Sequence, residues 1–149
     1  MKSNLKNFLA QYARFSDLEL EKITAEFKNR AYKRNQFLLR EGDVCKDLIF
    51  VEKGCVRLFY LKDDVEISVW FAFQHSSAIE IHSFISETPT DYFLQAIEDS
   101  TVYFLPKTKL QKLYQAYPQM QEMMRNFWED VILNLLSRFT SLQKESAEK

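Results

Sequence analysis

The stretch LLREGDVCKDLIFVEKGCVRLFY, residues 38–60, contains both glycines of the chain. Gly42 follows Glu41 and Gly54 follows Lys53, and each glycine adjoins a run of aliphatic and aromatic residues. Glycine takes positive φ without a steric penalty, so it is the expected residue at tight turns. The stretch therefore predicts two turns on either side of a β-strand.

The length and composition indicate one globular domain. The 149 residues suit one domain, or one domain with an appended element. A chain of this size buries roughly 68–70% of its unfolded surface, so its core needs no metal or disulfide. Apolar residues make up 46% of the chain and aromatic residues 15%. The formal net charge of −1 lacks the basic excess of a nucleic-acid-binding surface.

The two cysteines, Cys45 and Cys55, are interpreted as reduced, partly buried thiols of a cytoplasmic protein, and one disulfide is the alternative. The N-terminal sequence MKSNLKNFLAQYARFSD has no long apolar core of a secretory leader. No apolar run approaches the ~18 residues that cross a bilayer. We therefore expect a cytoplasmic protein that does not enter a membrane.

Three regions of different periodicity divide the chain. Residues 1–28 show helical spacing and a capping-box pattern, Ser16 with Glu19, which predicts two short helices. Residues 29–117 are rich in β-branched and aromatic residues broken by polar clusters. They predict six to eight short strands uninterrupted by a helix, in a sandwich or barrel, with a short helix at the end. Residues 118–149 return to the helical period and predict one long helix.

The apolar stripe of the predicted long helix is wider than one core-facing side requires. Six of its residues follow a near-heptad spacing, namely Met124, Trp128, Val131, Leu135, Phe139 and Leu142. This spacing predicts that the helix pairs with the same helix of a second subunit, which makes the protein a homodimer. A helix buried wholly against its own β-domain is the alternative.

Short helices, a compact β-region with EGD and KG turns, and then a long apolar helix resemble the effector domain of the Crp/Fnr family of bacterial regulators. The stretch quoted above is similar to the segment over that family's first strands. The resemblance implies a mainly β fold with flanking helices, the double-stranded β-helix or jelly roll of cyclic-nucleotide-binding domains. Gly42 and Gly54 would then lie in the first two hairpin connections.

The resemblance also implies a function. In this family the long helix pairs two subunits and is followed by a winged helix-turn-helix that reads DNA. The sequence ends at Lys149, before that position, so DNA contact is expected only through a segment outside these residues. Whether the chain is a piece of a longer protein or lacks that part remains open. We expect the effector-sensing and dimerisation domain of a transcriptional regulator, and the alternative is a stand-alone jelly-roll interaction module without an effector.

The family's ligand-binding segment aligns with residues in the second half of the β-region. There a Gly-Glu pair binds phosphate and ribose, and an Arg-Ser or Arg-Thr pair neutralises the cyclic phosphate. Glu80 falls at the glutamate, with Ile79 at the glycine and Ile81 on its other side. Thr90 falls at the arginine and Asp91 at the serine. The candidate pocket therefore has an altered phosphate-binding segment.

These departures predict that the domain does not bind cyclic AMP or cyclic GMP. Losing a charge-assisted hydrogen bond costs roughly 1.5–3 kcal/mol. A carboxylate such as Asp91 at ~4 Å adds roughly 4 kcal/mol of repulsion at an effective dielectric near 20. Leu135 and Leu136 fall where the family's helix contacts the purine, and neither side chain can hydrogen-bond. An unknown effector is expected to be neutral or apolar, and an empty, collapsed pocket is the alternative.

Metal, cofactor and catalytic chemistry find little support in the sequence. His75 and His82 form no paired-ligand pattern, and two cysteines cannot supply the four thiolates of an iron–sulfur cluster. The chain has no Gly-rich phosphate loop and no G-x-S-x-G motif. We therefore expect no cofactor and no enzymatic activity. The aromatic residues of the β-region are expected in the core, namely Trp70, Phe71, Phe73, Phe84, Tyr92 and Phe93.

Overall fold

In a computed structural model, which describes residues 2–148, the chain forms seven strands and five helices. The strands are β1 (Lys28–Tyr32), β2 (Phe37–Leu39), β3 (Asp47–Lys53), β4 (Cys55–Lys62), β5 (Val65–Phe73), β6 (Phe93–Ala96) and β7 (Ser100–Pro106). The helices are α1 (Ser3–Ala10), α2 (Asp17–Thr24), α3 (Ile81–Ser86), α4 (Lys107–Ala116) and α5 (Pro118–Glu148). The domain limits predicted at residues 1 and 149 lie outside the described residues.

The strands form two antiparallel sheets, one in the order β1-β7-β3 and one in the order β2-β6-β4-β5. Consecutive strands mostly lie in different sheets, and within residues 2–148 only β4 and β5 pair as a hairpin. This mainly β architecture with flanking helices confirms the predicted fold class. The expectation that no helix interrupts the strands is wrong, because α3 lies between β5 and β6. Its six residues are too few to leave a helical period in the sequence.

Both glycines adopt positive φ, +95° at Gly42 and +101° at Gly54. They are not hairpin glycines, because the strands on either side of each belong to different sheets. A Cβ at Gly54 would lie 2.1 Å from Ser100 Oγ and 2.8 Å from the carbonyl oxygen of Asp99. Gly54 is therefore needed both for its conformation and for the close approach of β7, whereas Gly42 has open space around it and is needed for its φ alone.

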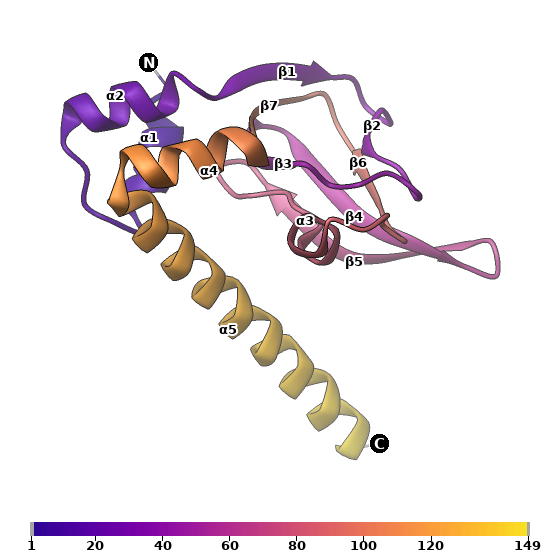
Figure 1. Ribbon diagram of the computed structural model, residues 1–149. Coiled ribbons are helices and arrows are strands. Elements are labelled where there is room, and N and C mark those ends of the chain that lie inside the picture. The colour runs from indigo at the N-terminus through magenta and orange to yellow at the C-terminus, as the bar shows by residue number, and fades with distance from the viewer. Residues whose placement is uncertain (1, 149) are drawn as a thin grey trace.

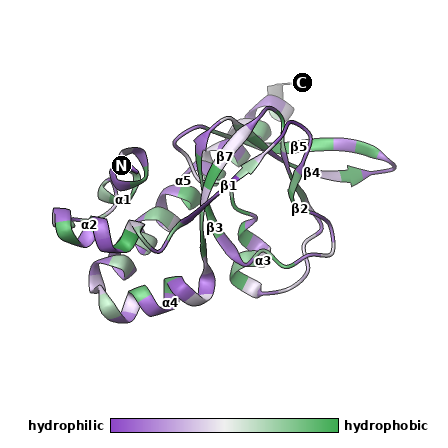
Figure 2. Cartoon of the chain, turned by 90° about the horizontal axis from the view of Figure 1, so that it is seen from above, coloured by the Kyte–Doolittle hydropathy of each residue, from purple (hydrophilic) through white to green (hydrophobic). Residues whose placement is uncertain are grey.

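Helices α1, α2 and α4 gather at one end of the sheets, and α5 leaves this cluster and extends away from it (Figure 1). Ser16 and Glu19 form the predicted capping box at the start of α2. Leu5, Phe50 and Met120 belong to one continuous core that joins the helices to the sheets. Seen from above, hydrophobic and hydrophilic residues alternate along these elements, as amphipathic packing requires (Figure 2).

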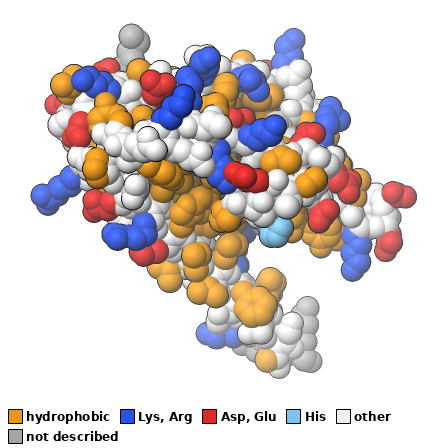
Figure 3. Space-filling view, in the orientation of Figure 1, with side chains coloured by type: hydrophobic (Ala, Val, Ile, Leu, Met, Phe, Trp, Pro, Cys, Tyr) orange, Lys and Arg blue, Asp and Glu red, His pale blue; other side chains and the backbone are white. Residues whose placement is uncertain are grey.

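The environment of α5 changes along its length. Its first four turns bury Met120, Met123, Met124 and Phe127, with Trp128 and Val131 partly buried. From residue 132 to 147 every side chain is exposed. The large apolar ones are Ile132, Leu133, Leu135, Leu136, Phe139 and Leu142. Hydrophobic side chains are visible along the helix and between it and the sheets in Figure 3. The alternative of a helix buried wholly against its own β-domain is therefore wrong.

The aromatic residues of the β-region divide between core and surface. Phe84 is buried, but Phe71 and Phe73 are exposed on β5, where their ring centroids lie 6.5 Å apart. The prediction that these two fill the core is wrong. β5 is an edge strand whose alternate residues point away from the sandwich, so a run of aromatic residues cannot all face inward.

Candidate ligand pocket

A pocket of about 490 Å³ lies between α5, the end of α1, strands β4 and β5, and the segment 75–82 that leads into α3. This volume falls in the range of roughly 300–1,000 Å³ typical of small-molecule sites. The aromatic lining residues are Phe8, Tyr12, Trp70, Tyr92 and Phe127. The polar ones are Gln11, His75, Ser76, Ser77, Glu80, His82, Asp130 and Asn134. A molecule bound here would contact both the β-domain and α5.

The structure brings together part of the predicted site. Glu80, Ile81 and Leu135 line the pocket. Asp91 and Leu136 are exposed and are not among the residues that line this pocket. Asp91 lies just before β6, and Leu136 lies beyond the part of α5 that packs on the β-domain.

Glu80 is 4% exposed and its carboxylate is surrounded by donors. Its Oε1 accepts a hydrogen bond from the backbone N–H of His82 (2.9 Å), and its Oε2 accepts one from that of Ser83 (3.1 Å). The hydroxyl of Thr90 donates to Oε2 (2.7 Å) and accepts from the N–H of Tyr92 (3.0 Å). Glu80 is thus the N-cap of α3 and occupies backbone N–H groups at the helix start.

A turn of the opening stretch holds this arrangement in place. Ser83 Oγ accepts a hydrogen bond from the N–H of Cys45 (2.9 Å). The N–H of Gly42 donates to the carbonyl of Thr90 (2.9 Å), and the N–H of Thr90 donates to the carbonyl of Asp43 (2.8 Å). Both ends of the segment that contains α3 are therefore tied to residues 42–45.

The lining carries negative charge. Glu80 and Asp130 contribute carboxylates, and no lysine or arginine lines the pocket in the part of the chain that the structure describes. The hydroxyl of Tyr12 donates to Asp130 Oδ2 (2.8 Å), and burial together with this carboxylate raises the pKa of Tyr12, which stays a neutral donor. Near the pocket, the guanidinium of Arg138 lies 3.8 Å from the ring centroid of Trp70 and donates to the carbonyl of Val69 (3.1 Å).

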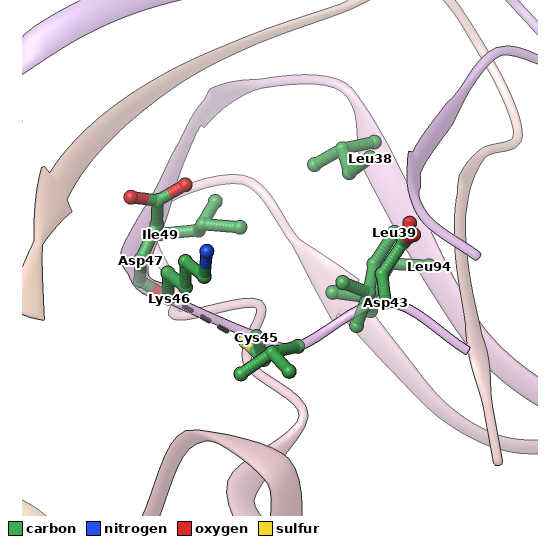
Figure 4. Close-up of a pocket in the computed structure, with 9 residues that line it drawn as sticks. Leu38, Leu39, Asp43, Cys45, Lys46, Asp47, Ile49 and Leu94 are labelled. Carbon is green, nitrogen blue, oxygen red and sulfur yellow. Dashed lines mark hydrogen bonds between the residues drawn. The ribbon is translucent and has the colours of Figure 1, made fainter. Parts of the chain in front are cut away.

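A second, smaller cavity of about 350 Å³ lies where β2 and β6 approach the start of β3 (Figure 4). Its lining residues are Leu38, Leu39, Asp43, Val44, Cys45, Lys46, Asp47, Ile49 and Leu94. Burial raises the pKa of the Cys45 thiol to about 11, so near neutral pH the thiol is protonated and is a poor nucleophile. Cys45 and Cys55 are both free, which excludes the disulfide alternative.

Across residues 2–148, no three His, Cys, Asp or Glu side chains group in a way that could hold a metal ion. None of the described helices is long and apolar enough to span a bilayer.

Apart from Leu135, sequence reasoning missed the side of the pocket that α1 and α5 supply. Phe8 and Tyr12 come from α1 and the turn after it, and Phe127 and Asp130 come from α5. The spacing of Phe8 and Tyr12 marks an apolar helix face. It does not indicate which surface that face covers, so no local signal leads to the pocket.

The family model for the cyclic nucleotide-binding domain matches residues 29–117. The chain belongs to this family. No curated protein matches the sequence. Among solved structures, this cyclic nucleotide-binding domain is similar to the catabolite activator protein of Thermus thermophilus, with 19% identity and a TM-score of 0.73 over 93% of this chain and 63% of that one. The chain thus spans less than two thirds of that regulator.

Two further structures share the fold. A cyclic nucleotide-binding domain from Methylobacillus flagellatus is 18% identical, with a TM-score of 0.74 over 93% of this chain and 78% of that one. CLP, the c-di-GMP responsive global regulator of Xanthomonas campestris, is 21% identical, with a TM-score of 0.69 over 82% of this chain and 61% of that one. The resemblance inferred from the opening stretch is confirmed for the domain, and the regulators share its fold.

Proposed function

We propose that these residues form the effector-sensing and dimerisation region of a Crp/Fnr-like transcriptional regulator. Residues 1–28 and 29–117 would form the sensing unit, and residues 118–149 the dimerisation helix. The observation that supports this most is the pocket shared by the β-domain and α5. A ligand shifts a conformational equilibrium only by contacting its two states differently. A molecule between the sheets and α5 meets that requirement, because any movement of α5 changes its contacts.

The pocket does not take a cyclic nucleotide in this proposal. The Glu80 carboxylate already accepts from the N–H groups of His82 and Ser83, and Thr90 supplies a hydroxyl to it. The family's ribose-binding glutamate is kept as Glu80, but a cyclic phosphate would find the hydroxyl of Thr90, which already donates to Glu80, in place of the family's arginine, and no lysine or arginine among the described lining residues. Losing one charge-assisted hydrogen bond costs roughly 1.5–3 kcal/mol, or about one to two orders of magnitude in affinity.

Isothermal titration calorimetry with cyclic AMP and cyclic GMP tests this part of the proposal. We expect no heat of binding at ligand concentrations up to the millimolar range, with circular dichroism confirming that the protein is folded. Micromolar or tighter binding of either nucleotide would show that the Glu80 network opens, and the proposal of an altered sensor would fall.

The exposed half of α5, residues 132–142, is proposed as the surface that pairs two copies of the chain. Leu135, Phe139 and Leu142 continue the near-heptad stripe, and each is about half exposed or more. Met124, Trp128 and Val131, which belong to the same stripe, are already used in the protomer's own core. A second helix would therefore cover the later part of the stripe and leave the earlier part unchanged.

Analytical ultracentrifugation tests the pairing. The wild-type chain is expected to sediment as a dimer, and the double substitution Leu136→Asp with Phe139→Asp as a monomer. Ser137→Asp is the matched control for Phe139→Asp alone, since each adds one negative charge and Ser137 lies about half a turn away from Phe139 on the opposite side of the helix. A monomeric wild type at high concentration, or an equal loss of dimer in the control, would contradict the proposal.

Arg138 is proposed to connect the pocket with the pairing surface. It projects from the exposed half of α5 onto Trp70 and the carbonyl of Val69, and both of these residues line the pocket. A ligand that displaces Trp70 would disturb this contact and so alter the position of residues next to Leu135 and Phe139. DNA would be contacted by a segment outside these residues. In this proposal the role of the chain is regulatory and not catalytic.

A further inference from the structure

The charge and aromatic content of the pocket point to a class of ligand. This inference rests on the proposed sensing function and narrows it. Two carboxylates, from Glu80 and Asp130, line the space, and the lining described in this structure includes no lysine or arginine. An anionic ligand would therefore meet two carboxylates and no lysine or arginine, and the basic side chains in the described lining are those of His75 and His82.

The Glu80 carboxylate is fixed in place. It is buried, and its two oxygens are held by three donors, so it cannot turn away to make room for an anion. Asp130 lies on the α5 side of the pocket and is exposed, with one oxygen bonded to the hydroxyl of Tyr12. Its other oxygen, Oδ1, has no hydrogen bond within the described part of the protein. Asp130 therefore has an acceptor available for a donor on a ligand.

The aromatic residues that line the pocket also favour a cationic ligand over an anionic one. Phe8, Tyr12, Trp70, Tyr92 and Phe127 surround the pocket on several sides. The faces of aromatic rings attract cations, and clusters of such rings recognise organic ammonium groups. Trp70 already carries one cation in this structure, because the guanidinium of Arg138 lies 3.8 Å from its ring centroid. Arg138 itself is not a lining residue.

We propose that the pocket binds an organic cation, a protonated amine carried on an aromatic body. The amine would lie toward Asp130, and the aromatic body would pack among Trp70, Tyr92 and Phe127. The volume of about 490 Å³ is sufficient for a molecule of one or two rings. Such a ligand would contact α5 and the sheets together, as the sensing function requires.

The test uses three probes that share one ring system and differ in charge. Tryptamine is a cation, indole-3-acetamide is neutral, and indole-3-acetate is an anion. In calorimetric titrations of the whole chain at neutral pH, tryptamine is expected to bind at least tenfold more tightly than the acetamide, and the acetate is expected not to bind. Equal affinity for the three, tighter binding of the acetate, or no binding of tryptamine would overturn the inference.

Two matched variants examine the role of Asp130. Asp130→Asn removes the charge and keeps the shape, and the tenfold preference of tryptamine over the acetamide should shrink to about twofold. Glu129→Gln removes an exposed carboxylate from the neighbouring residue, which does not line the pocket, and the preference should be unchanged. An Asp130→Asn variant that retains the full preference would contradict the assignment.

The same samples separate this inference from the function on which it rests. Cyclic AMP is titrated into each of them. If cyclic AMP binds, the altered-sensor function fails whatever the indoles do. If neither cyclic AMP nor tryptamine binds and the protein sediments as a dimer, the altered nucleotide site and the pairing are both supported, and the organic-cation inference alone is wrong.

Discussion

The two halves of α5 place the same kind of side chain in opposite environments. Phe127, in the half that packs on the β-domain, is 4% exposed, whereas Phe139, twelve residues later on the same helix, is 59% exposed. Phe127 contacts the ring of Phe8 at a centroid distance of 5.8 Å, and its neighbour Trp128 lies 6.0 Å from Phe84 of α3. Among residues 2–148, no aromatic ring contacts Phe139 in this way. An apolar helix face has to be covered by another surface. The rest of the protomer covers this face of α5 only as far as residue 131.

The largest expected effect is the loss of stability on truncating Phe127, compared with the same truncation of Phe139. Phe127→Ala should lower the free energy of unfolding by about 3–5 kcal/mol, because it leaves a cavity in the core. Phe139→Ala should cost less than about 0.5 kcal/mol in the monomer, since its side chain faces solvent. Urea unfolding at several protein concentrations measures both. A loss for Phe139→Ala that matches Phe127→Ala at high dilution would show that the exposed half packs on its own protomer.

The next largest effect concerns Glu80, which holds α3 beneath the packed half of α5. Glu80→Ala should cost about 3 kcal/mol, because the N–H groups of His82 and Ser83 and the hydroxyl of Thr90 lose their acceptor. Glu80→Gln should cost less, since an amide keeps one acceptor oxygen.

The control for this experiment is Glu122→Ala, which removes an exposed carboxylate from α5. Chemical denaturation followed by tryptophan fluorescence is a suitable measurement, because Trp128 packs on Phe84 of α3. If Glu80→Ala proves as stable as Glu122→Ala, the hydrogen bonds around Glu80 contribute nothing to the support of the packed half.

The pH dependence of stability tests whether water reaches the buried Cys45 thiol. The backbone N–H of Cys45 donates to Ser83 of α3. Burial raises the pKa of the Cys45 thiol from 9.0 to about 11. The unfolded chain therefore loses this proton first, so the stability contribution is complete below pH 9 and is lost as the pH rises toward 11. Over that window the wild type should lose roughly 2–3 kcal/mol more than Cys45→Ala does. Parallel stability curves for the two proteins would mean that water reaches the thiol.

The smallest expected effect is on the contact between the exposed half and β5. Arg138→Met keeps the length of the side chain and removes its charge, so it loses the interaction with Trp70. We expect a loss of about 0.5–1 kcal/mol in stability and a change in tryptophan fluorescence. Arg125→Met, at an exposed position of the packed half, is the control and should change neither. Identical behaviour of the two variants would argue that Arg138 is not held on the ring.

Local signals in the sequence predicted much of the fold. Ser16 and Glu19 define the start of α2, because a capping box depends on residues three apart. The return of the helical period at Pro118 predicts α5. Local signals do not determine which strands pair. The positive φ of Gly42 and Gly54 is predictable from local sequence, but the flanking strands do not form the predicted hairpins, because they pair with β6 and β7, far along the chain.

The surroundings of the candidate site residues also depend on contacts between distant parts of the chain. The alignment with the family's motif identified Glu80 as a pocket residue, and it lines the pocket. The motif did not indicate that Thr90 would donate to Glu80, or that Asp91 would face solvent. A shift of one residue at the start of a strand reverses the direction of a side chain, so spacing alone does not determine which group faces the ligand.

By itself the sequence determined the helical and extended segments other than the short helix α3, where glycine was required, and that α5 carries more apolar surface than one side can bury. These properties depend on residues a few positions apart. Only the tertiary structure decided that Glu80 bonds inward to Ser83 and Thr90, and that aromatic residues from α1 and α5 complete one pocket with Trp70. These contacts join residues distant in the chain, and the direction of each side chain was set by packing and by the hydrogen bonds that buried polar groups must make.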